Sequence, residues 1–261
     1  MSRTKASDVE AIVLELAPLA GGVPGDRNGI VWGSHDTRVT GIAVTWTPTV
    51  AVLREAAMRR LNFIITHEWP WFVGASSPWF AVTPEDEKPA NIARRQIVDA
   101  HQMVLCCCHS NWDGVRTDGV VDSLARTLGF FVELHSSRYL RVYQIHRRTL
   151  AELAMHVKLR LGVPNVRVAG DLGMEVERVG VAVGGLAQNW NFIDELVANG
   201  AQAVVVGECI DYSVRIAVDS GVGLIETSHV ASENPGMRNL ARLLDDVPVE
   251  FIDAGQPWVH L

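Results

Sequence analysis

Residues 103–113 read MVLCCCHSNWD, and the fold class follows from this stretch and from the residues that come after it. The first six residues are all apolar, which is typical of a buried strand. The polar run from His109 to Asp113 ends that strand, and residues 119–128 then have the apolar spacing of a helix. A buried strand, a polar turn and a helix together form the repeating unit of α/β proteins.

The same alternation of strand and helix patterns continues along the chain. Short runs rich in β-branched residues predict strands, and apolar residues spaced three or four positions apart predict helices. Further strands are expected at residues 39–45, 61–66, 141–145, 166–169, 179–183, 203–206 and 222–225. Further helices are expected at residues 50–60, 91–101, 149–161, 191–198, 211–219 and 237–244. Strands that alternate with helices in this way indicate an α/β fold with mostly parallel sheets.

An internal similarity divides the chain into two related halves. A predicted strand, a His-x-x-x-acid motif and a helix containing Leu-Ala-Arg-x-Leu occur in this order twice, with the motifs at residues 109–113 and 229–233. The strand–helix–strand units before the motifs also correspond, and each closes with an acid, Glu68 in one and Glu208 in the other. We therefore expect two related α/β halves, residues 1–130 and residues 131–261.

The composition is that of a globular protein. The chain has 261 residues, of which 48% are hydrophobic and 20% charged, so it can build a sizeable core. Its formal net charge is −7, from 23 basic and 30 acidic residues, which disfavours binding to nucleic acid. No apolar run approaches the roughly 20 residues of a membrane span. The first residues are too interrupted by acids for a signal peptide.

The cysteines do not form a disulfide pattern. Cys106, Cys107 and Cys108 are consecutive, Cys209 stands alone, and the spacing C-x-x-C is absent from the sequence. Adjacent residues of a strand point to opposite faces, so the set is typical of reduced thiols in a cytoplasmic protein.

Three polar clusters follow predicted strands, and we interpret them as a candidate metal site. They are His67-Glu68, residues 109–113 and residues 229–233. Ligands of parallel α/β sheets bind beyond the carboxyl ends of the strands, so the clusters are expected to converge in a cleft between the halves. Histidine and carboxylate ligands favour Zn, Mn, Fe or Co. Two ions held close together need bridging carboxylates, for which Asp113 and Glu233 are the candidates.

Each of these residues also has a structural interpretation. A histidine after a strand is commonly a capping or surface residue, and His109 could simply fix the turn before Asp113. Asp113, Glu208 and Glu233 could be acids at helix starts, stabilised by the helix dipole. Glu233 also stands just before Asn234-Pro235, and proline is common in the first turn of a helix.

Two further features have competing interpretations. Trp69, Trp71 and Trp79 crowd the loop after Glu68 and could form a stacking wall for a planar ligand such as a base. Packing in the core or at a subunit interface is the favoured alternative. The glycine-rich turn at residues 183–186 could cradle phosphate, but it lacks the motifs of known phosphate loops and is better explained as a tight turn.

The order of these motifs resembles that of the Nif-three-like family, whose bacterial members are often named GTP cyclohydrolase type two-like dinuclear-metal proteins. The resemblance spans nearly the whole chain. The matching stretches are GDRNGI at 25–30, THEWP at 66–70, HSNWD at 109–113, LARTLG at 124–129, Gly207-Glu208, and the closing pair His229 and Glu233.

The resemblance implies a two-domain α/β protein with a dinuclear metal site and a ring-like hexameric assembly. The family's ligands map onto His67, Glu68, Asp113, His229 and Glu233. Glu68 departs from the family pattern, which usually has a second histidine there. Within this site we expect Asp113 and Glu233 to bridge two divalent ions, and His109 to orient a ligand.

The leading functional hypothesis is a metal-dependent hydrolase. The resemblance suggests a nucleotide-type substrate, with opening of the GTP ring as the reaction in the family's name. The alternative is a non-catalytic metal-binding scaffold, a metal-trafficking protein or a regulator that acts through protein partners. A third possibility is an α/β protein that binds its ligand without metal.

Overall fold

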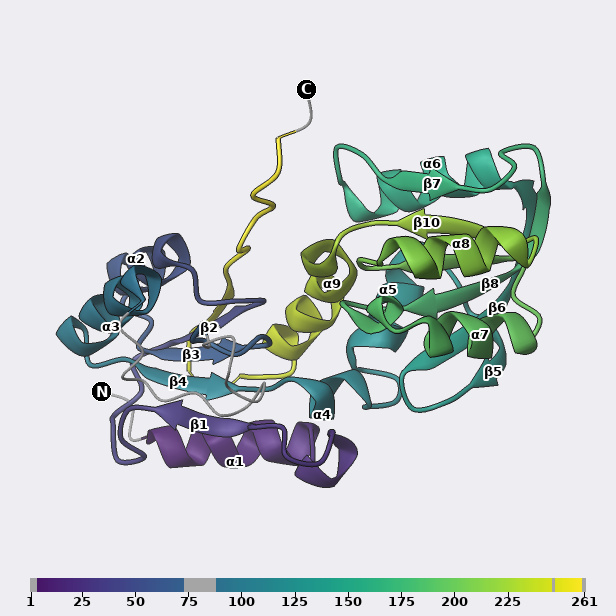
Figure 1. Cartoon of the computed structure of the whole chain (residues 1–261). Coiled ribbons are helices and arrows are strands. Elements are labelled where there is room, and N and C mark those ends of the chain that lie inside the picture. The colour runs from purple at the N-terminus through teal and green to yellow at the C-terminus, as the bar shows by residue number, and fades with distance from the viewer. Residues whose placement is uncertain (1–3, 73–87, 246, 260–261) are drawn as a thin grey trace. The chain divides into compact units, whose positions relative to one another are not determined.

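The computed structural model describes residues 4–72, 88–245 and 247–259, and the chain folds into two compact units (Figure 1). The first unit contains Met1–Val115 and Met237–Leu261, and the second unit contains Arg116–Gly236. These bounds differ from the expected halves at residues 1–130 and 131–261. The difference arises because the helix after Asp113 belongs to the second unit, whereas the last segment of the chain returns to the first.

The first unit is built on a five-stranded sheet with the strand order β1-β4-β3-β2-β11. β1 pairs antiparallel with β4, and the other neighbours are parallel. The strands β2, β3 and β4 are fully buried, as their continuous apolar sequences predict. The strands are β1 (Gly29–Trp32), β2 (Ile42–Thr45), β3 (Phe63–Thr66), β4 (Val104–Cys107) and β11 (Val249–Phe251).

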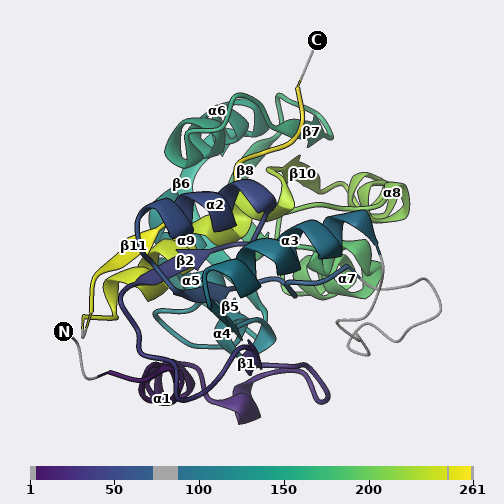
Figure 2. The same ribbon diagram turned by 90° about the vertical axis from the view of Figure 1, so that its left-hand side faces the viewer.

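Helices cover this sheet through their apolar stripes. α2 and α3 lie side by side over one face (Figure 2), where Leu53 and Val98 pack against Ala43, Ile64 and Leu105. α1 runs beside β1 (Figure 1). The elements are α1 (Ala6–Leu16), the short 3-10 helix η1 (Leu19–Gly21), α2 (Val50–Met58), α3 (Pro89–Ala100) and α4 (Ser110–Asp113).

The second unit is built on a six-stranded sheet with the strand order β5-β6-β8-β9-β10-β7. The neighbours β8, β9 and β10 are parallel. β5 pairs antiparallel with β6, β6 with β8, and β7 with β10 at the other edge of the sheet. The strands are β5 (Val132–Ser136), β6 (Leu140–Thr149), β7 (Arg167–Ala169), β8 (Glu175–Ala182), β9 (Ala203–Val206) and β10 (Gly223–Glu226).

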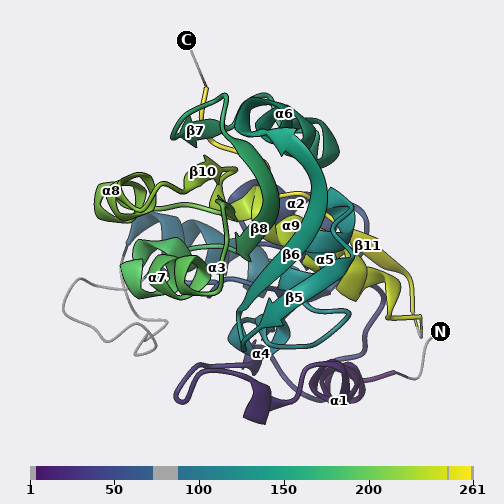
Figure 3. The same ribbon diagram turned by 90° about the vertical axis from the view of Figure 1, so that its right-hand side faces the viewer.

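Helices lie on both faces of the second sheet. α7 and α8 cover one side, where Ile193, Leu196 and Ala217 enter the core, and α5 and α6 cover the other side (Figure 3). The elements are α5 (Val120–Leu128), α6 (Leu150–Leu161), η2 (Leu186–Gln188), α7 (Trp190–Ala198) and α8 (Asp211–Asp219). The last helix, α9 (His229–Arg242), contains the boundary between the units.

The predicted α/β class is confirmed, although helix α1 and strands β1, β5 and β11 were not predicted, and two further details differ. The first sheet is mostly parallel as expected, whereas the second is mixed because the long hairpin β5–β6 adds antiparallel strands. The helix expected to begin near residue 237 begins at His229 instead, so Pro235 lies inside it. Its first turn is held by Ser228, whose hydroxyl accepts a hydrogen bond from the amide of Ala231 at 3.2 Å.

Two smaller expectations can be compared with the fold. Cys106, Cys107 and Cys108 are buried, and burial raises the pKa of each thiol. Within the described ranges, no helix combines the length and the apolar character needed to cross a membrane.

Candidate metal centre

Candidate ligands stand at the carboxyl ends of parallel strands in both units. In the first unit β3 and β4 are paired so that Thr66 is opposite Cys107. His67 and His109 therefore leave the sheet at the same edge, one and two residues beyond that pair. In the second unit Val206 is opposite Glu226, and Glu208 and His229 follow in the same manner. The register of parallel strands thus gathers residues that are far apart in sequence.

Three side chains form what we call the first ligand group: His67, His109 and Asp113. Each offers a nitrogen or oxygen atom, and these atoms all lie within 4.8 Å of one another. His67 Nε2 is 3.4 Å from Asp113 Oδ1, and the rings of His67 and His109 have their centroids 5.0 Å apart. The single turn of α4 carries Asp113 back toward His67, because the amide of Asp113 donates to the carbonyl of His109.

Hydrogen bonds fix the orientation of both histidines in the first ligand group. His67 is fully buried, and its Nδ1 lies 3.0 Å from the carbonyl oxygen of Cys108. A carbonyl can only accept, so Nδ1 carries the proton and Nε2 presents its lone pair. His109 Nδ1 lies 3.0 Å from Asp26 Oδ2, and the same reasoning leaves its Nε2 as the ligand atom.

Asp26 is the anchor of the first ligand group. It accepts hydrogen bonds from the ring of His109 and from the amide and hydroxyl of Ser110. Burial alone would raise the pKa of Asp26, but these hydrogen bonds outweigh it and hold the pKa well below its ordinary value. For His109, burial by itself would lower the pKa. The hydrogen bond to Asp26 and the nearby carboxylates of Glu68 and Asp113 outweigh burial, so the pKa of His109 is raised overall. The loop is further fixed by Asn28, whose Oδ1 accepts from the amide of His109 at 2.8 Å.

Glu68 lies beside the first ligand group. Its Oε1 is 3.9 Å from His109 Nε2, and its side chain is 25% exposed. Its backbone is held by the hydroxyl of Thr66, which donates to the Glu68 carbonyl at 2.8 Å. The carboxylate is therefore within reach of an ion bound to His109.

The second ligand group comprises two candidate ligands, His229 and Glu233, together with Glu208, which contacts the other ring nitrogen of His229 and orients the ring. His229 Nδ1 is 3.2 Å from Glu208 Oε1, and His229 Nε2 is 3.3 Å from Glu233 Oε2. His229 and Glu233 are one helical turn apart on α9, so they share a face. The bond from His229 lowers the pKa of Glu208, which also accepts from Gln188.

The turn after β8 makes room for the second ligand group. Gly184 has a φ of +55°, and a Cβ atom there would overlap the Glu233 carboxylate and lie 2.9 Å from His229 Nε2. Ser232 holds the turn from the other side, since its hydroxyl accepts from the Gly184 amide at 2.9 Å. Ser228, just before His229, has a φ of +102°, an uncommon backbone state that is frequent at functional sites.

The donor atoms fit a divalent metal ion of the Zn, Mn, Fe or Co type. Each group combines imidazole nitrogen with carboxylate oxygen, the mixture that such ions accept. Each histidine has its Nδ1 occupied by an oxygen acceptor, which is the arrangement found around metal-binding histidines in general. His109, expected as an orienting residue, has the geometry of a ligand, and Asp26 takes the orienting position instead.

The structural interpretations of the acids hold only in part. Asp113 lies in the single turn of α4 and is therefore an acid of a first helical turn, but its Oδ1 also lies 3.4 Å from His67 Nε2. Glu233 lies in the second turn of α9, beyond the start of that helix. Glu208 precedes α8, but its carboxylate is bonded to His229 and Gln188. His109 fixes its turn through the carboxylate of Asp26 rather than through the backbone.

Sequence reasoning missed Asp26 as an orienting residue and Gly184 as a spacer. Asp26 was part of a matching motif, and that motif was the one signal for it. Gly184 had a signal in its glycine pair, which we interpreted as a tight turn. The structure adds that the turn must lack a side chain because Glu233 lies against it.

Trp69 and Trp71, the described tryptophans of the loop after Glu68, both pack against the core of the first unit. Trp71 is buried and joins the core of the first unit, where its ring meets Trp32 at 5.2 Å between centroids. Trp69 is half-buried. Trp79 lies outside the described residues.

Comparisons with known proteins place these residues in a family context. A family model described as Duf34/NIF3 (NGG1p interacting factor 3) matches residues 4–257. A Clostridium perfringens protein named GTP cyclohydrolase 1 type 2 homolog is 25% identical over 262 residues, which cover 95% of each chain.

Solved structures show the same fold. A Bacillus cereus protein related to NIF3 covers 100% of both chains with a TM-score of 0.84 and 15% identity. A Staphylococcus aureus hypothetical protein covers 98% of this chain and 99% of its own, with a TM-score of 0.84 and 21% identity. At these identities the likeness establishes the fold alone.

Proposed function

Because the chain belongs to the DUF34/NIF3 family, we propose that it binds two divalent metal ions through the first and second ligand groups and uses them in hydrolysis of a nucleotide-type substrate. The observation that supports this most is the first ligand group, in which His67, His109 and Asp113 bring three ligand atoms within 4.8 Å of one another. The name of the Clostridium perfringens relative motivates a GTP-like substrate. The ions belong to the Zn, Mn, Fe or Co class.

The residues of this chain would act by presenting and orienting ligand atoms. The contacts of Asp26 and of the Cys108 carbonyl with Nδ1 orient the rings of His109 and His67, so that Nε2 of each ring faces the other members of the group. Glu208 lies 3.2 Å from His229 Nδ1 and orients that ring, whose Nε2 faces Glu233. When bound, divalent ions supply Lewis-acid activation of water for attack on an electrophilic carbon or phosphorus. Asp113 would supply a carboxylate ligand in the first group, and Glu233 would do so in the second.

Metal analysis followed by turnover assays tests the proposal. The purified full-length chain is loaded in turn with Zn, Mn, Fe and Co, desalted, and analysed by mass spectrometry for bound metal. We expect two ions per chain for at least one metal. The loaded protein is then incubated with GTP and with phosphoesters, and products are separated by chromatography.

The two measurements separate the proposal from its alternatives. Metal retention without turnover would support the non-catalytic scaffold or trafficking role. If the chain takes up none of the four metals, the proposed metal site is wrong, and the remaining alternative is a protein that binds its ligand without metal. The ring-like hexamer is part of the same proposal and is tested by light scattering.

A further inference from the structure

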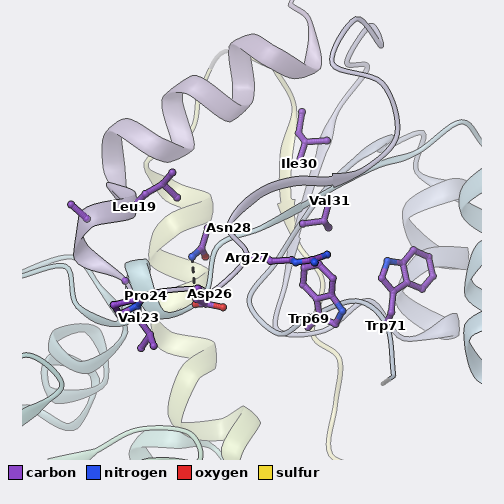
Figure 4. Close-up of a pocket in the computed structure, with 13 residues that line it drawn as sticks. Leu19, Val23, Pro24, Asp26, Arg27, Asn28, Ile30, Val31, Trp69 and Trp71 are labelled. Atoms are coloured by element: carbon purple, nitrogen blue, oxygen red, sulfur yellow. Dashed lines mark hydrogen bonds between the residues drawn. The ribbon is translucent and has the colours of Figure 1, made fainter. Parts of the chain in front are cut away.

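A pocket of about 740 Å³ lies in the first unit, next to the anchor of the first ligand group (Figure 4). Its walls come from the loop after η1, from β1 and from the loop after Glu68. They include Leu19, Val23, Arg27, Val31, Trp69 and Trp71. The volume is in the range of sites for small molecules, and Asp26, which orients His109, lies on its wall.

One wall of the pocket is aromatic and held in place. Asn91 pairs with Phe72 through two hydrogen bonds of 2.8 Å, and the buried Arg94 donates to the carbonyl of Pro70. These contacts from α3 fix the loop on which Trp69 and Trp71 stand. Arg27 extends over the ring of Trp69, with its Cζ 5.7 Å from the ring centroid (Figure 4).

The charges of the pocket favour an anion. Arg27 is exposed, and no carboxylate within the described ranges forms an ion pair with it. Asp26 is the acid of the wall, but its carboxylate is occupied by His109 and Ser110. The pocket therefore presents a guanidinium group beside an indole face, with its one acid already compensated.

We propose that this pocket binds a planar aromatic anion, with the ring stacked on Trp69 and the negative group paired with Arg27. This deepens the proposed function and rests on it in one respect, since it takes the anion to be a purine nucleotide that is the substrate. A ring stacked on the indole needs a contact of about 3.5 Å with it, in the space over Trp69 that the guanidinium of Arg27 now covers. Arg27 must then move outward from its present 5.7 Å, which an exposed and flexible side chain can do.

Isothermal titration calorimetry of the full-length chain tests the pocket, with guanosine monophosphate, guanosine and ribose 5-phosphate as probes. We expect guanosine monophosphate to bind more tightly than either of the other two. Trp69→Leu should weaken both guanosine and its monophosphate about tenfold, because stacking is lost. Arg27→Gln should weaken the monophosphate about tenfold and guanosine much less, because only the monophosphate carries the charge that Arg27 pairs.

Two matched variants serve as controls for the titrations. Trp69→Phe retains an aromatic face and should restore most of the binding, which separates stacking from a packing defect. Arg54→Gln removes the same charge from an exposed position on α2 and should change nothing. Equal binding by wild type, Trp69→Leu and Arg27→Gln would overturn the inference. So would binding of ribose 5-phosphate as tight as that of the nucleotide.

The outcome is distinguishable from failure of the proposed function. The titrations are made on the protein as purified and again after chelation, with bound metal measured each time. Nucleotide binding that depends on Trp69 and Arg27 in a chain that takes up no metal would remove the metal proposal and keep the pocket. Metal uptake without any effect of these variants would do the reverse.

Discussion

The two ligand groups offer the same kinds of ligand atom, but their residues are brought together in different ways. The first is assembled from two strand ends and a loop, so that residues as distant as Asp26, His67 and Asp113 must be brought together by the sheet. In the second, His229 and Glu233 stand one turn apart on a single helix, and Glu208 is the one distant member. Their burial also differs, since the side chain of Asp26 is 3% exposed and that of Glu208 is 40% exposed.

This difference indicates where each group is vulnerable. The first group depends on strand register and on a buried carboxylate, so changes in its surroundings should matter nearly as much as changes in its ligands. The second depends on helix pitch, which is robust, and on the clearance that Gly184 provides. Variants that compare equivalent positions of the two groups test this contrast directly.

Removal of a carboxylate ligand should have the largest effect in both groups. We expect Asp113→Ala and Glu233→Ala each to lower metal affinity more than about 100-fold, beyond the effect of removing a residue that only orients a ligand. Equilibrium titration with mass-spectrometric metal analysis measures this. Glu15→Gln, an exposed acid of α1, is the control and should bind as wild type. A loss in only one of the two variants would mean that only one group holds metal.

Gly184→Ala should damage the second group and spare the first. The added Cβ would overlap the Glu233 carboxylate, so we expect a loss of up to about 100-fold at the second group, with His67 and Asp113 still binding. Gly221→Ala is the matched control, since it has a φ of +71° with no atom within 4 Å. Both variants carry similar backbone strain, and their difference measures the overlap alone. Equal affinities in the two would show that Glu233 can move without consequence.

Replacement of the more deeply buried orienting acid, Asp26, should lower metal affinity more than replacement of Glu208. Asp26→Asn should lower the affinity of the first group about 10- to 100-fold, because a buried carboxylate that fixes His109 is lost. Glu208→Gln should fall at the low end of that range, because its more exposed carboxylate can be replaced by water. The same titrations give both values. A larger loss of metal affinity in Glu208→Gln than in Asp26→Asn would show that burial of the orienting acid does not determine its contribution.

Proton competition should be visible at the first group. The pKa of His109 is raised, so at a given acidic pH more of this imidazole is protonated than is usual, and a metal ion must displace that proton. Affinity should therefore fall as the pH decreases, starting at a higher pH than for an ordinary histidine. In Asp26→Asn the hydrogen bond that raises the pKa is gone, so the fall should start at a lower pH. Titrations between about pH 5 and 8 would show the shift, and coincident pH profiles would count against it.

The sequence could predict the strand ends but not the anchors. Apolar runs that stop shortly before His67, His109 and His229 predict where parallel strands end, and β3, β4 and β10 end one to three residues before these histidines. Asp26 lies in a polar, glycine-flanked loop with no periodic pattern, so its pairing with His109 depends on folding over a separation of 83 residues. The requirement for glycine at 184 is likewise set by a side chain from another element, Glu233.

Helix boundaries and edge strands were the weaker part of the prediction. Pro235 suggested a helix start, because proline is common in the first turn, whereas Ser228 provides the actual cap seven residues earlier. The exposed strand β5 lacks the apolar run that marked the central strands, so it was missed along with its antiparallel pairing to β6. The helix after the first His-x-x-x-acid motif, α5, belongs to the second unit, whereas the part of α9 from Met237 onward belongs to the first, which no local pattern in the sequence specifies.

The smallest effect is expected from Glu68→His, which introduces the residue that the resemblance implies at this position. Glu68 Oε1 already lies 3.9 Å from His109 Nε2, so the position can contribute a ligand with either side chain. Imidazole binds borderline metals such as Zn well, so we expect affinity for the ion nearest His109 to rise several-fold while affinity at the second ligand group changes little. Glu68→Ala is the companion variant and should lower the same affinity. Unchanged stoichiometry and affinity in both variants would show that Glu68 is not a ligand, and would leave the first group with His67, His109 and Asp113 alone.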